Sequence, residues 1–265
     1  MKIVGAACLI AATCTAAGQT TMSQVFESVR APHDVELSAN PQEAFWLGAI
    51  PTYAVSDSHG IAVPGHRTEV RSRWTSDNLY LLFICPYQEL YLKPSPDTKV
   101  ETNELWNWDV AELFIGADYS DIKRYKEFEV SPQGEWIDLD INLARPHHEV
   151  GWTWSSGFHF AARIDREKHI WYAAMRIPFR SIDGRKPAVG NVFRANLFRS
   201  QGPPERRKSI AWSAPMTDTF HTPERFGTLK LVQQNKLSLG SGLCWIGWLR
   251  TLEFALPRST RPRFC

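Results

Sequence analysis

The fold is decided by the stretch ELWNWDVAELFIG, residues 104–116. Its second half, Val110–Ile115, is apolar except for Glu112, a pattern that predicts a β-strand with both faces covered. The first half carries two tryptophans, Trp106 and Trp108, among polar residues, which predicts a loop leading into the strand. The stretch therefore predicts a buried strand preceded by aromatic rings.

Two carboxylates mark the same strand. Asp109 and Glu112 are three residues apart, and side chains at that spacing on an extended strand point to opposite faces. The two groups therefore cannot act together on one bond as a simple acid/base pair. We expect Asp109 to be structural, capping the loop or meeting a metal, and Glu112 to face a ligand.

Short strands of this kind recur along the chain, separated by turn sequences such as SDN (76–78) and SPQG (131–134). The expected strands are 68–74, 78–85, 110–115, 125–130, 136–141, 152–164, 170–177, 191–199 and 227–232. Helical periodicity is poor apart from one short turn at 178–182. The pattern predicts an all-β fold, an antiparallel β-sandwich of jelly-roll or immunoglobulin-like form.

The N-terminus has the pattern of a secretory signal peptide. Lys2 supplies a positive charge, the apolar or small run Ile3–Thr13 is too short to span a bilayer, and small residues follow at 15–18. We therefore expect a signal peptide at 1–18, a linker at 19–30, and an exported protein that is periplasmic, secreted or on the cell surface. Lipoprotein anchoring at Cys14 is the less favoured alternative, because a residue smaller than Thr13 is usual there.

The body of the chain, residues 31–232, is expected to form one domain, and the tail, residues 233–265, differs from it. The body has no transmembrane segment and one cysteine, Cys85, so it has no internal disulfide. The tail is basic, so the body is mildly acidic although the net charge of the chain is +2. An acidic body argues against nucleic acid as a partner. The tail is either an interfacial anchor or a segment without selected structure.

Tryptophan is abundant in the body, where nine of the eleven tryptophans lie between residues 46 and 212. Strands prefer smaller β-branched residues, so a core of this size does not need them all. A pyranose ring has an apolar face of C–H groups that stacks on an aromatic ring, while polar side chains bind its hydroxyls. Trp106 therefore has two interpretations, a lid over the core or a platform for a sugar.

The motif W-x-x-D-x-x-E-x-F-I at 106–115 is similar to the signature of family 9 carbohydrate-binding modules, which are β-sandwiches of the DOMON-like group. A second segment, IAWSAPMTDTFHTPERFGTL at 210–229, resembles the closing segment of that family, in which an aromatic residue and a proline precede Phe-Gly and the last strand. The resemblance extends from about Pro32 to Val232. It implies a β-sandwich that binds a mono-, oligo- or polysaccharide.

The resemblance also implies which residues form the site. In this family two aromatic rings hold a sugar ring at the mouth of the site, and they correspond to Trp106 and Phe220. Polar side chains hold the sugar hydroxyls, and the positions that correspond to them are Glu112, Glu129, Ser131, Asn196 and Thr217. The residues expected to support the site are Trp108, Asp109 and Trp212.

Three of these positions depart from the family pattern. Glu129 stands where an arginine is expected, Ser131 stands where an amide is usual, and Phe220 is smaller than the usual tryptophan. Each lost contact of this kind changes binding by about 1 kcal/mol. The sugar, and whether its reducing end is recognised, can therefore differ from the ligand of the best-known members.

The family often holds structural calcium through loop carboxylates and carbonyls. The acidic residue expected after strand 78–85 is Pro86 in this chain. Other oxygen clusters occur at Asp118–Asp121 and at Asp138 with Asp140. They are interpreted either as calcium ligands or as solvated loop charges, and the sequence leaves both open.

Two other functions stay open. A glycoside hydrolase needs two carboxyl groups about 5–5.5 Å or 6.5–9.5 Å apart across a cleft, and Glu112 with Glu129 is the available pair. A haem-binding relative of the DOMON group uses methionine and histidine as axial ligands, and the available residues are Met175, Met216 and His221. The sequence names neither the sugar nor the oligomeric state.

Overall fold

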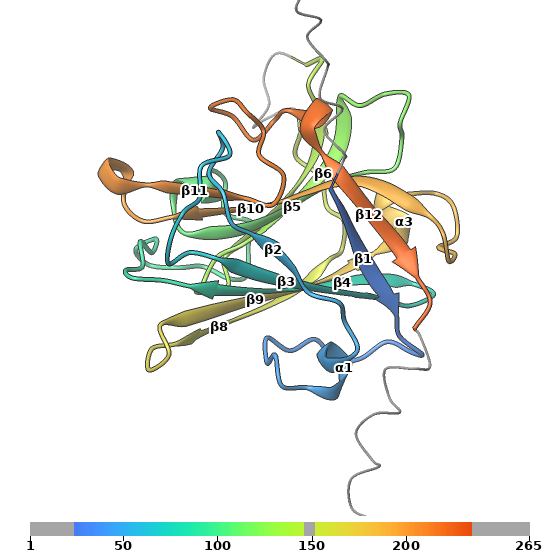
Figure 1. Cartoon of the computed structure of the whole chain (residues 1–265), viewed down its shortest axis with the longest axis horizontal. Helices are drawn as coiled ribbons and strands as arrows, with labels where there is room; N and C mark the ends of the chain where they lie inside the picture. Colours follow the sequence, from blue (N-terminus) through green and yellow to red (C-terminus); the bar gives the residue numbers. More distant parts are fainter. Residues whose placement is uncertain (1–23, 146–151, 235–265) are drawn as a thin grey trace, which may run out of the picture.

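The computed structural model describes residues 24–145 and 152–234. Over these residues the chain forms twelve strands in one continuous sheet, which bends into two stacked layers (Figure 1). The all-β sandwich expected from the strand pattern is confirmed. The predicted signal peptide, including Cys14, and the predicted tail from residue 235 lie outside the described residues.

The two layers have different strands. The first layer contains, in spatial order, β7 (Trp136–Asn142), β6 (Arg124–Val130), β5 (Val110–Gly116) and β10 (Val192–Gln201), with β11 (Lys208–Ala211) beside one end of β10. The second layer contains β8 (His159–Asp165), β9 (Ile170–Pro178), β4 (Asn78–Pro86) and β3 (Thr68–Trp74), with β2 (Thr52–Ala54) beside β3. Neighbours within each layer pair antiparallel, as expected.

Strand β1 (Val25–Arg30) joins the two layers, so the prediction that residues 25–30 belong to a linker is wrong. It pairs in parallel with β12 (Gly227–Val232) on one side and with β3 on the other. Its buried Phe26 packs edge-on against Trp212, with ring centroids 5.2 Å apart. The sequence pattern gave no strand signal because only three of the six residues are apolar and charged residues interrupt them.

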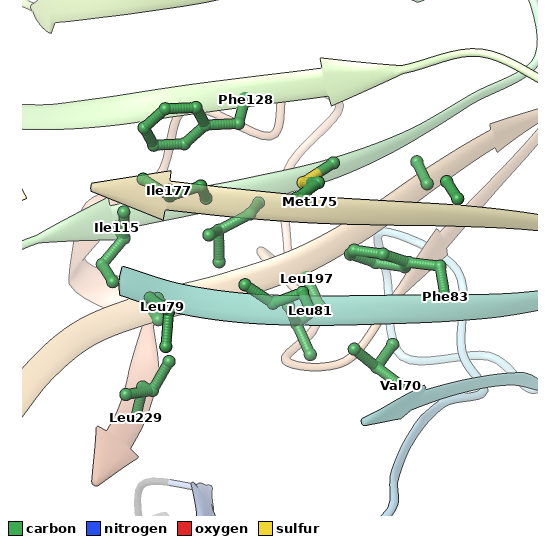
Figure 2. Close-up of a cluster of buried hydrophobic side chains, with 14 of the residues drawn as sticks. Val70, Leu79, Leu81, Phe83, Ile115, Phe128, Met175, Ile177, Leu197 and Leu229 are labelled. Atoms are coloured by element: carbon green, nitrogen blue, oxygen red, sulfur yellow. The ribbon is translucent and has the colours of Figure 1, made fainter. Parts of the chain in front are cut away.

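The core lies between the two layers and is filled by apolar side chains from both (Figure 2). Each fully buried aliphatic or aromatic side chain of this kind contributes about 1.5–3 kcal/mol. The side chains labelled in Figure 2 are Val70, Leu79, Leu81, Phe83, Ile115, Phe128, Met175, Ile177, Leu197 and Leu229. Cys85 is buried in the same core as a free thiol.

The strand expected to start at residue 152 begins only at His159. Trp152 packs on the outer face of the first layer, whereas Phe158 lies in the core between the layers. Between them, the backbone N–H and hydroxyl of Ser156 donate hydrogen bonds to Asp138. The chain crosses from one layer to the other here, and a continuous strand cannot make that crossing.

Helices are few and short. The described residues contain α1 (Ala44–Leu47), α3 (Phe179–Ile182) and the 3-10 turns η1 (Leu105–Asn107), η2 (Pro204–Arg206) and η3 (Pro223–Arg225). Helix α3 confirms the short turn expected at 178–182. Within the described part of the chain, no helix has the length and apolar character needed to cross a membrane. Functional side chains are therefore positioned by strands and loops.

Candidate functional site

The outer face of the first layer carries a second aromatic cluster, separate from the core. Alternation along β5 sends Leu113 into the core and brings Glu112 and Phe114 to the outer face. The strand register then places Glu112 between Glu129 of β6 and Phe198 of β10. A carboxylate is thus held in the middle of an aromatic surface.

A pocket of about 350 Å³ opens on this face. Strand residues including Glu112 and Glu127 form its floor, while two loops provide aromatic walls through Trp106 and Phe220. This volume lies at the lower end of the range for small-ligand sites, which are mostly apolar with a few placed polar groups. The composition of the pocket therefore fits a small ligand that has both an apolar face and polar groups.

Arg207 holds the loop that carries Trp106. Its guanidinium donates hydrogen bonds to the backbone carbonyls of Trp106, Trp108 and Gly202. The ring of Trp108 stacks on Tyr91 with centroids 4.7 Å apart and does not line the pocket. One arginine thereby fixes the backbone within η1 and directly after it, while Trp108 anchors the loop and Trp106 lines the pocket.

Asp109 lies at the end of the same loop and is fully buried. Its carboxylate accepts hydrogen bonds from the backbone N–H groups of Tyr91 and Gly202 and from the side chain of Gln201. Burial raises the pKa of Asp109, and the hydrogen bonds from the N–H groups of Gly202 and Tyr91 act in the opposite direction. The structure thus places Asp109 in a structural position, on the side of the strand opposite to Glu112.

Phe220 belongs to a loop with its own hydrogen bonds. Its ring stacks on Phe198, with centroids 4.1 Å apart and an angle of 6° between the planes. Thr217, expected to contact the ligand, does not line the pocket. Its hydroxyl donates to the carbonyl of Thr219 and meets the hydroxyl of Thr222, so it shapes the loop that presents Phe220.

His221 follows Phe220 in the chain and also lines the pocket. Its Nδ1 lies 2.7 Å from the hydroxyl of Tyr125, and its ring stacks on Phe114 with centroids 5.3 Å apart. The imidazole is therefore held in one orientation by strands β5 and β6.

Three buried glutamates meet at the floor of the pocket. One carboxylate oxygen each of Glu112, Glu127 and Glu129 lies within 4.8 Å of the other two. Burial and the neighbouring carboxylate raise the pKa values of Glu112 and Glu129 well above the usual range, and burial raises the pKa of Glu127 to about 8. These groups hold protons more tightly than ordinary glutamates, or else they require a cation.

Two predicted ligand contacts lie away from the pocket and are corrected. Asn196 is fully buried, and its side-chain amide bonds both the N–H and the carbonyl of Ser213. Ser131 is buried in the turn after β6, where its hydroxyl donates to the carboxylate of Glu135. Both side chains form hydrogen bonds within the fold, so neither points towards a ligand.

Trp212 supports the fold from the core side. It lies so close to Gly227 that a Cβ there would be 2.4 Å from a carbon of the tryptophan ring. The glycine of the Phe226-Gly227 sequence is therefore required by the packing of Trp212 under the last strand.

The carboxylates singled out for structural calcium do not gather into a cluster of three acidic groups in the part of the chain that the structure describes. Asp118 accepts hydrogen bonds from the N–H and hydroxyl of Ser120. Asp138 is bonded by Ser156, and Asp140 forms an ion pair with Lys126 at 2.7 Å. At least one oxygen of each of these aspartates is thus engaged within the chain, although Oδ1 of Asp138 is buried without a hydrogen-bond partner. The two groups of aspartates do not come together among the residues that the structure describes.

The residues named for a glycoside hydrolase and for a haem site do not take the positions that those functions require. Glu112 and Glu129 are neighbours on adjacent strands of one floor, so they do not face each other across a cleft. Met175 lies in the core, whereas His221 lies on the outer face of the first layer. Met216 is half exposed in the loop before His221. These positions support neither a hydrolase pair nor a haem bound between Met175 and His221.

Some pocket residues were missed from the sequence. Glu127 is two residues before Glu129 on the same strand, so strand alternation could have placed both on one face. Arg207 and His221 lie in irregular loops, where no periodic signal indicates which way a side chain points. Their presence in the pocket depends on long-range packing.

The chain is similar to known proteins both in sequence and in fold. It is 24% identical over 181 residues to "Extracellular protein" of Arthroderma benhamiae, covering 64% of this chain and 80% of that protein. A solved structure from Bacteroides uniformis, described as a "putative carbohydrate-binding protein", superposes with a TM-score of 0.63 at 16% identity, covering 79% of this chain and 99% of the other.

A family 9 carbohydrate-binding module from Caldicellulosiruptor kristjanssonii, solved in complex with cellotriose, superposes with a TM-score of 0.56 at 13% identity. The match covers 80% of this chain and 96% of that module. A structure of such a module from the same organism with glucose gives the same TM-score. The family model "Carbohydrate family 9 binding domain-like" matches residues 43–234. The chain belongs to the carbohydrate family 9 binding domain-like family.

Proposed function

We propose that the pocket on the outer face of the first layer binds a sugar ring. The observation that carries the proposal is the pairing of Trp106 and Phe220 with a carboxylate floor in one pocket of about 350 Å³. An aromatic ring stacks on the C–H face of a pyranose, while acceptors such as Glu112 bind hydroxyls. Family membership supports the same function.

The two aromatic rings have unequal roles in this proposal. Phe220 already has one face covered by Phe198, so it offers the ligand its other face or its edge. Trp106 is partly exposed and its backbone is held by Arg207, which presents a large ring at little entropic cost. Trp106 is therefore the main platform, and Phe220 is a secondary wall.

The polar rim can distinguish one sugar from another. Asn107 and Asp218 lie on the two loops that line the pocket, and Ser200 lies on its strand floor. The glucose and cellotriose found in the Caldicellulosiruptor modules are suitable first ligands to test. Glu129, at the position of the expected arginine, requires a wider panel that includes other hexoses, pentoses and amino sugars.

We also propose that the chain is exported. Support comes from the signal-like pattern at 1–18 and from the similarity to an extracellular protein of Arthroderma benhamiae. N-terminal sequencing of the protein recovered outside the cytoplasm tests this proposal: the expected mature N-terminus follows the small residues at 15–18. Recovery of the intact N-terminus from the cytoplasm alone would refute it.

Replacement of Trp106 tests the sugar site. We expect Trp106→Ala to lower the affinity for whichever sugar the parent binds by at least about tenfold, about 1.4 kcal/mol, because the stacking platform is lost. Isothermal titration calorimetry against the panel measures this. The matched control is Trp154→Ala, which removes a partly buried tryptophan on the core side of the first layer. Equal affinities for parent and Trp106→Ala would refute the proposed site.

A further inference from the structure

The three glutamates at the pocket floor form a cluster that the proposed sugar contacts do not explain. Glu127 and Glu129 come from alternate positions of β6, and Glu112 comes from the adjacent β5, opposite Glu129. We call Glu112, Glu127 and Glu129 the acidic trio. Their exposed fractions are 1%, 3% and 0%. The pocket reaches Glu112 and Glu127, and Glu129 lies fully buried beside them.

The acidic trio has too few partners for three buried carboxylates. Both oxygens of Glu129 and one oxygen of Glu127 are buried without a hydrogen-bond partner outside the trio. Glu127 and Glu129 hydrogen-bond each other. From outside the trio, the described residues provide one hydrogen bond, from Ser200 to Glu112 at 3.2 Å. Arg207, a nearby cation, is committed to three backbone carbonyls. Native proteins rarely bury carboxylates unless they are paired or coordinate a metal.

The spacing of the trio is compatible with a bound calcium ion. Calcium binds oxygen ligands at about 2.3–2.6 Å, so two oxygens on opposite sides of the ion lie up to about 4.6–5.2 Å apart. Magnesium binds at about 2.0–2.1 Å, which gives at most about 4.2 Å. One oxygen from each member of the trio lies within 4.8 Å of the others, an upper limit that lies within the calcium range. The preference for calcium comes from its ligand number, because it accepts more oxygen ligands in a more flexible geometry than magnesium does.

We infer that the acidic trio binds a calcium ion at the floor of the pocket, and that hydroxyl groups of the bound sugar complete its coordination. The second part of this inference rests on the proposed sugar-binding function. Calcium takes six to eight oxygen ligands, more than three carboxylates supply when each contributes one oxygen. Glu112 and Glu127 line the pocket, so the remaining positions face the space where the sugar lies. The ion also restores a positive charge where Glu129 replaces the expected arginine.

Calcium titration of the full chain tests the metal site directly. Calcium chloride is added to chelator-treated protein in a calorimeter, with magnesium chloride as the comparison. We expect one calcium per chain and weaker magnesium binding. The variant Glu129→Gln keeps the size of the side chain and removes one buried charge, and it lowers calcium affinity by about tenfold or more.

A matched control separates the trio from the general charge of the protein. Glu224→Gln removes an exposed glutamate outside the pocket, and calcium affinity is expected to stay at the parent value. A thermal melt of each variant in chelator shows that it is folded. Absence of calcium binding by the folded parent, or an equal loss in Glu224→Gln and Glu129→Gln, overturns the metal site.

The sugar titrations are repeated with calcium and with chelator. We expect chelation to lower the affinity of the parent for its sugar by about tenfold, because a charge-assisted contact is lost. Calcium binding without any effect on sugar affinity overturns the coordination of sugar by the ion and leaves the proposed function standing. Absence of sugar binding under every condition defeats the proposed function, whereas the calcium titration stands independently of it.

Discussion

Buried charged side chains on the two faces of the first layer differ in how many partners the fold gives them. On the core side, Arg199 is fully buried and its Nε has no hydrogen-bond partner, yet its two terminal nitrogens donate to Thr68 and to Gln201 and its guanidinium lies over the ring of Trp171 at 5.5 Å. On the outer side, the acidic trio is equally buried, but the described residues outside the trio give it one hydrogen bond, from Ser200 to Glu112.

This difference distinguishes a structural face from a binding face of the same sheet. A buried charge that its own fold surrounds with donors, acceptors and aromatic rings contributes to a unique packing arrangement. A buried charge that the fold leaves without partners is expected where a ligand or ion supplies them. Substitutions on the core face should therefore lower stability, and substitutions on the outer face should change binding.

The largest effect is expected on the core face. Leu113→Ala removes a fully buried side chain from the core and should lower the free energy of unfolding by about 2–5 kcal/mol. Urea or thermal unfolding measures this loss. Its neighbour on the outer face provides the contrast: Glu112→Gln, measured in chelator, should leave stability unchanged or raise it. Similar losses in the two variants would contradict the division between the faces.

A smaller effect is expected at the junction between the faces. Asp109→Ala leaves the N–H groups of Tyr91 and Gly202 and the amide of Gln201 without their acceptor, and should cost about 2–3 kcal/mol of stability. Asp109→Asn retains one acceptor oxygen and should lose less. Thermal unfolding of both variants provides the measurement, and an Asn variant as unstable as the Ala variant would argue against hydrogen bonding as the cause.

The smallest effect is expected at the loop that presents Trp106. Arg207→Lys keeps the charge but loses the planar fork that reaches three carbonyls, so sugar affinity should fall about fivefold, about 1 kcal/mol. Calorimetry measures the affinity, and tryptophan fluorescence reports a change at Trp106. Arg206→Lys is the matched control, because Arg206 pairs with Glu89 at 2.8 Å outside the pocket. Equal losses in both variants would mean that Arg207 does not position the loop.

Periodicity was sufficient to predict most of the fold. Strands such as β4 and β5 are continuous apolar runs bounded by turn residues, and both appear within one residue of the expected bounds. Strand β1 could not be predicted in the same way, because its partners β12 and β3 are distant in sequence and supply the burial that its own residues do not signal. The late start of β8 has the same cause, since the preceding residues pack on two different layers.

The candidate site was predictable only in part. The motif around Trp106 and Glu112 and the position of Phe220 were read from the sequence, and the three residues do line one pocket. Asn196 and Ser131 correspond to ligand-binding positions of the family, but in this chain their side chains form hydrogen bonds with neighbouring residues and do not line the pocket. The partners that distinguish this pocket, Arg207 and the third carboxylate of Glu127, are brought in by loop packing and strand register.

The parallel strand β1 also has a consequence for the order of folding. Its residue Val25 lies opposite Thr228 of β12, so the first and last strands of the described domain must meet before the sheet is continuous. Closing such a long loop is entropically costly and slows folding. A chain still being synthesised can assemble hairpins such as β3–β4 or β6–β7, because their partners are adjacent in sequence. It cannot close the seam between the layers until β12 is available, so closure of the sandwich is a late event that depends on the complete domain.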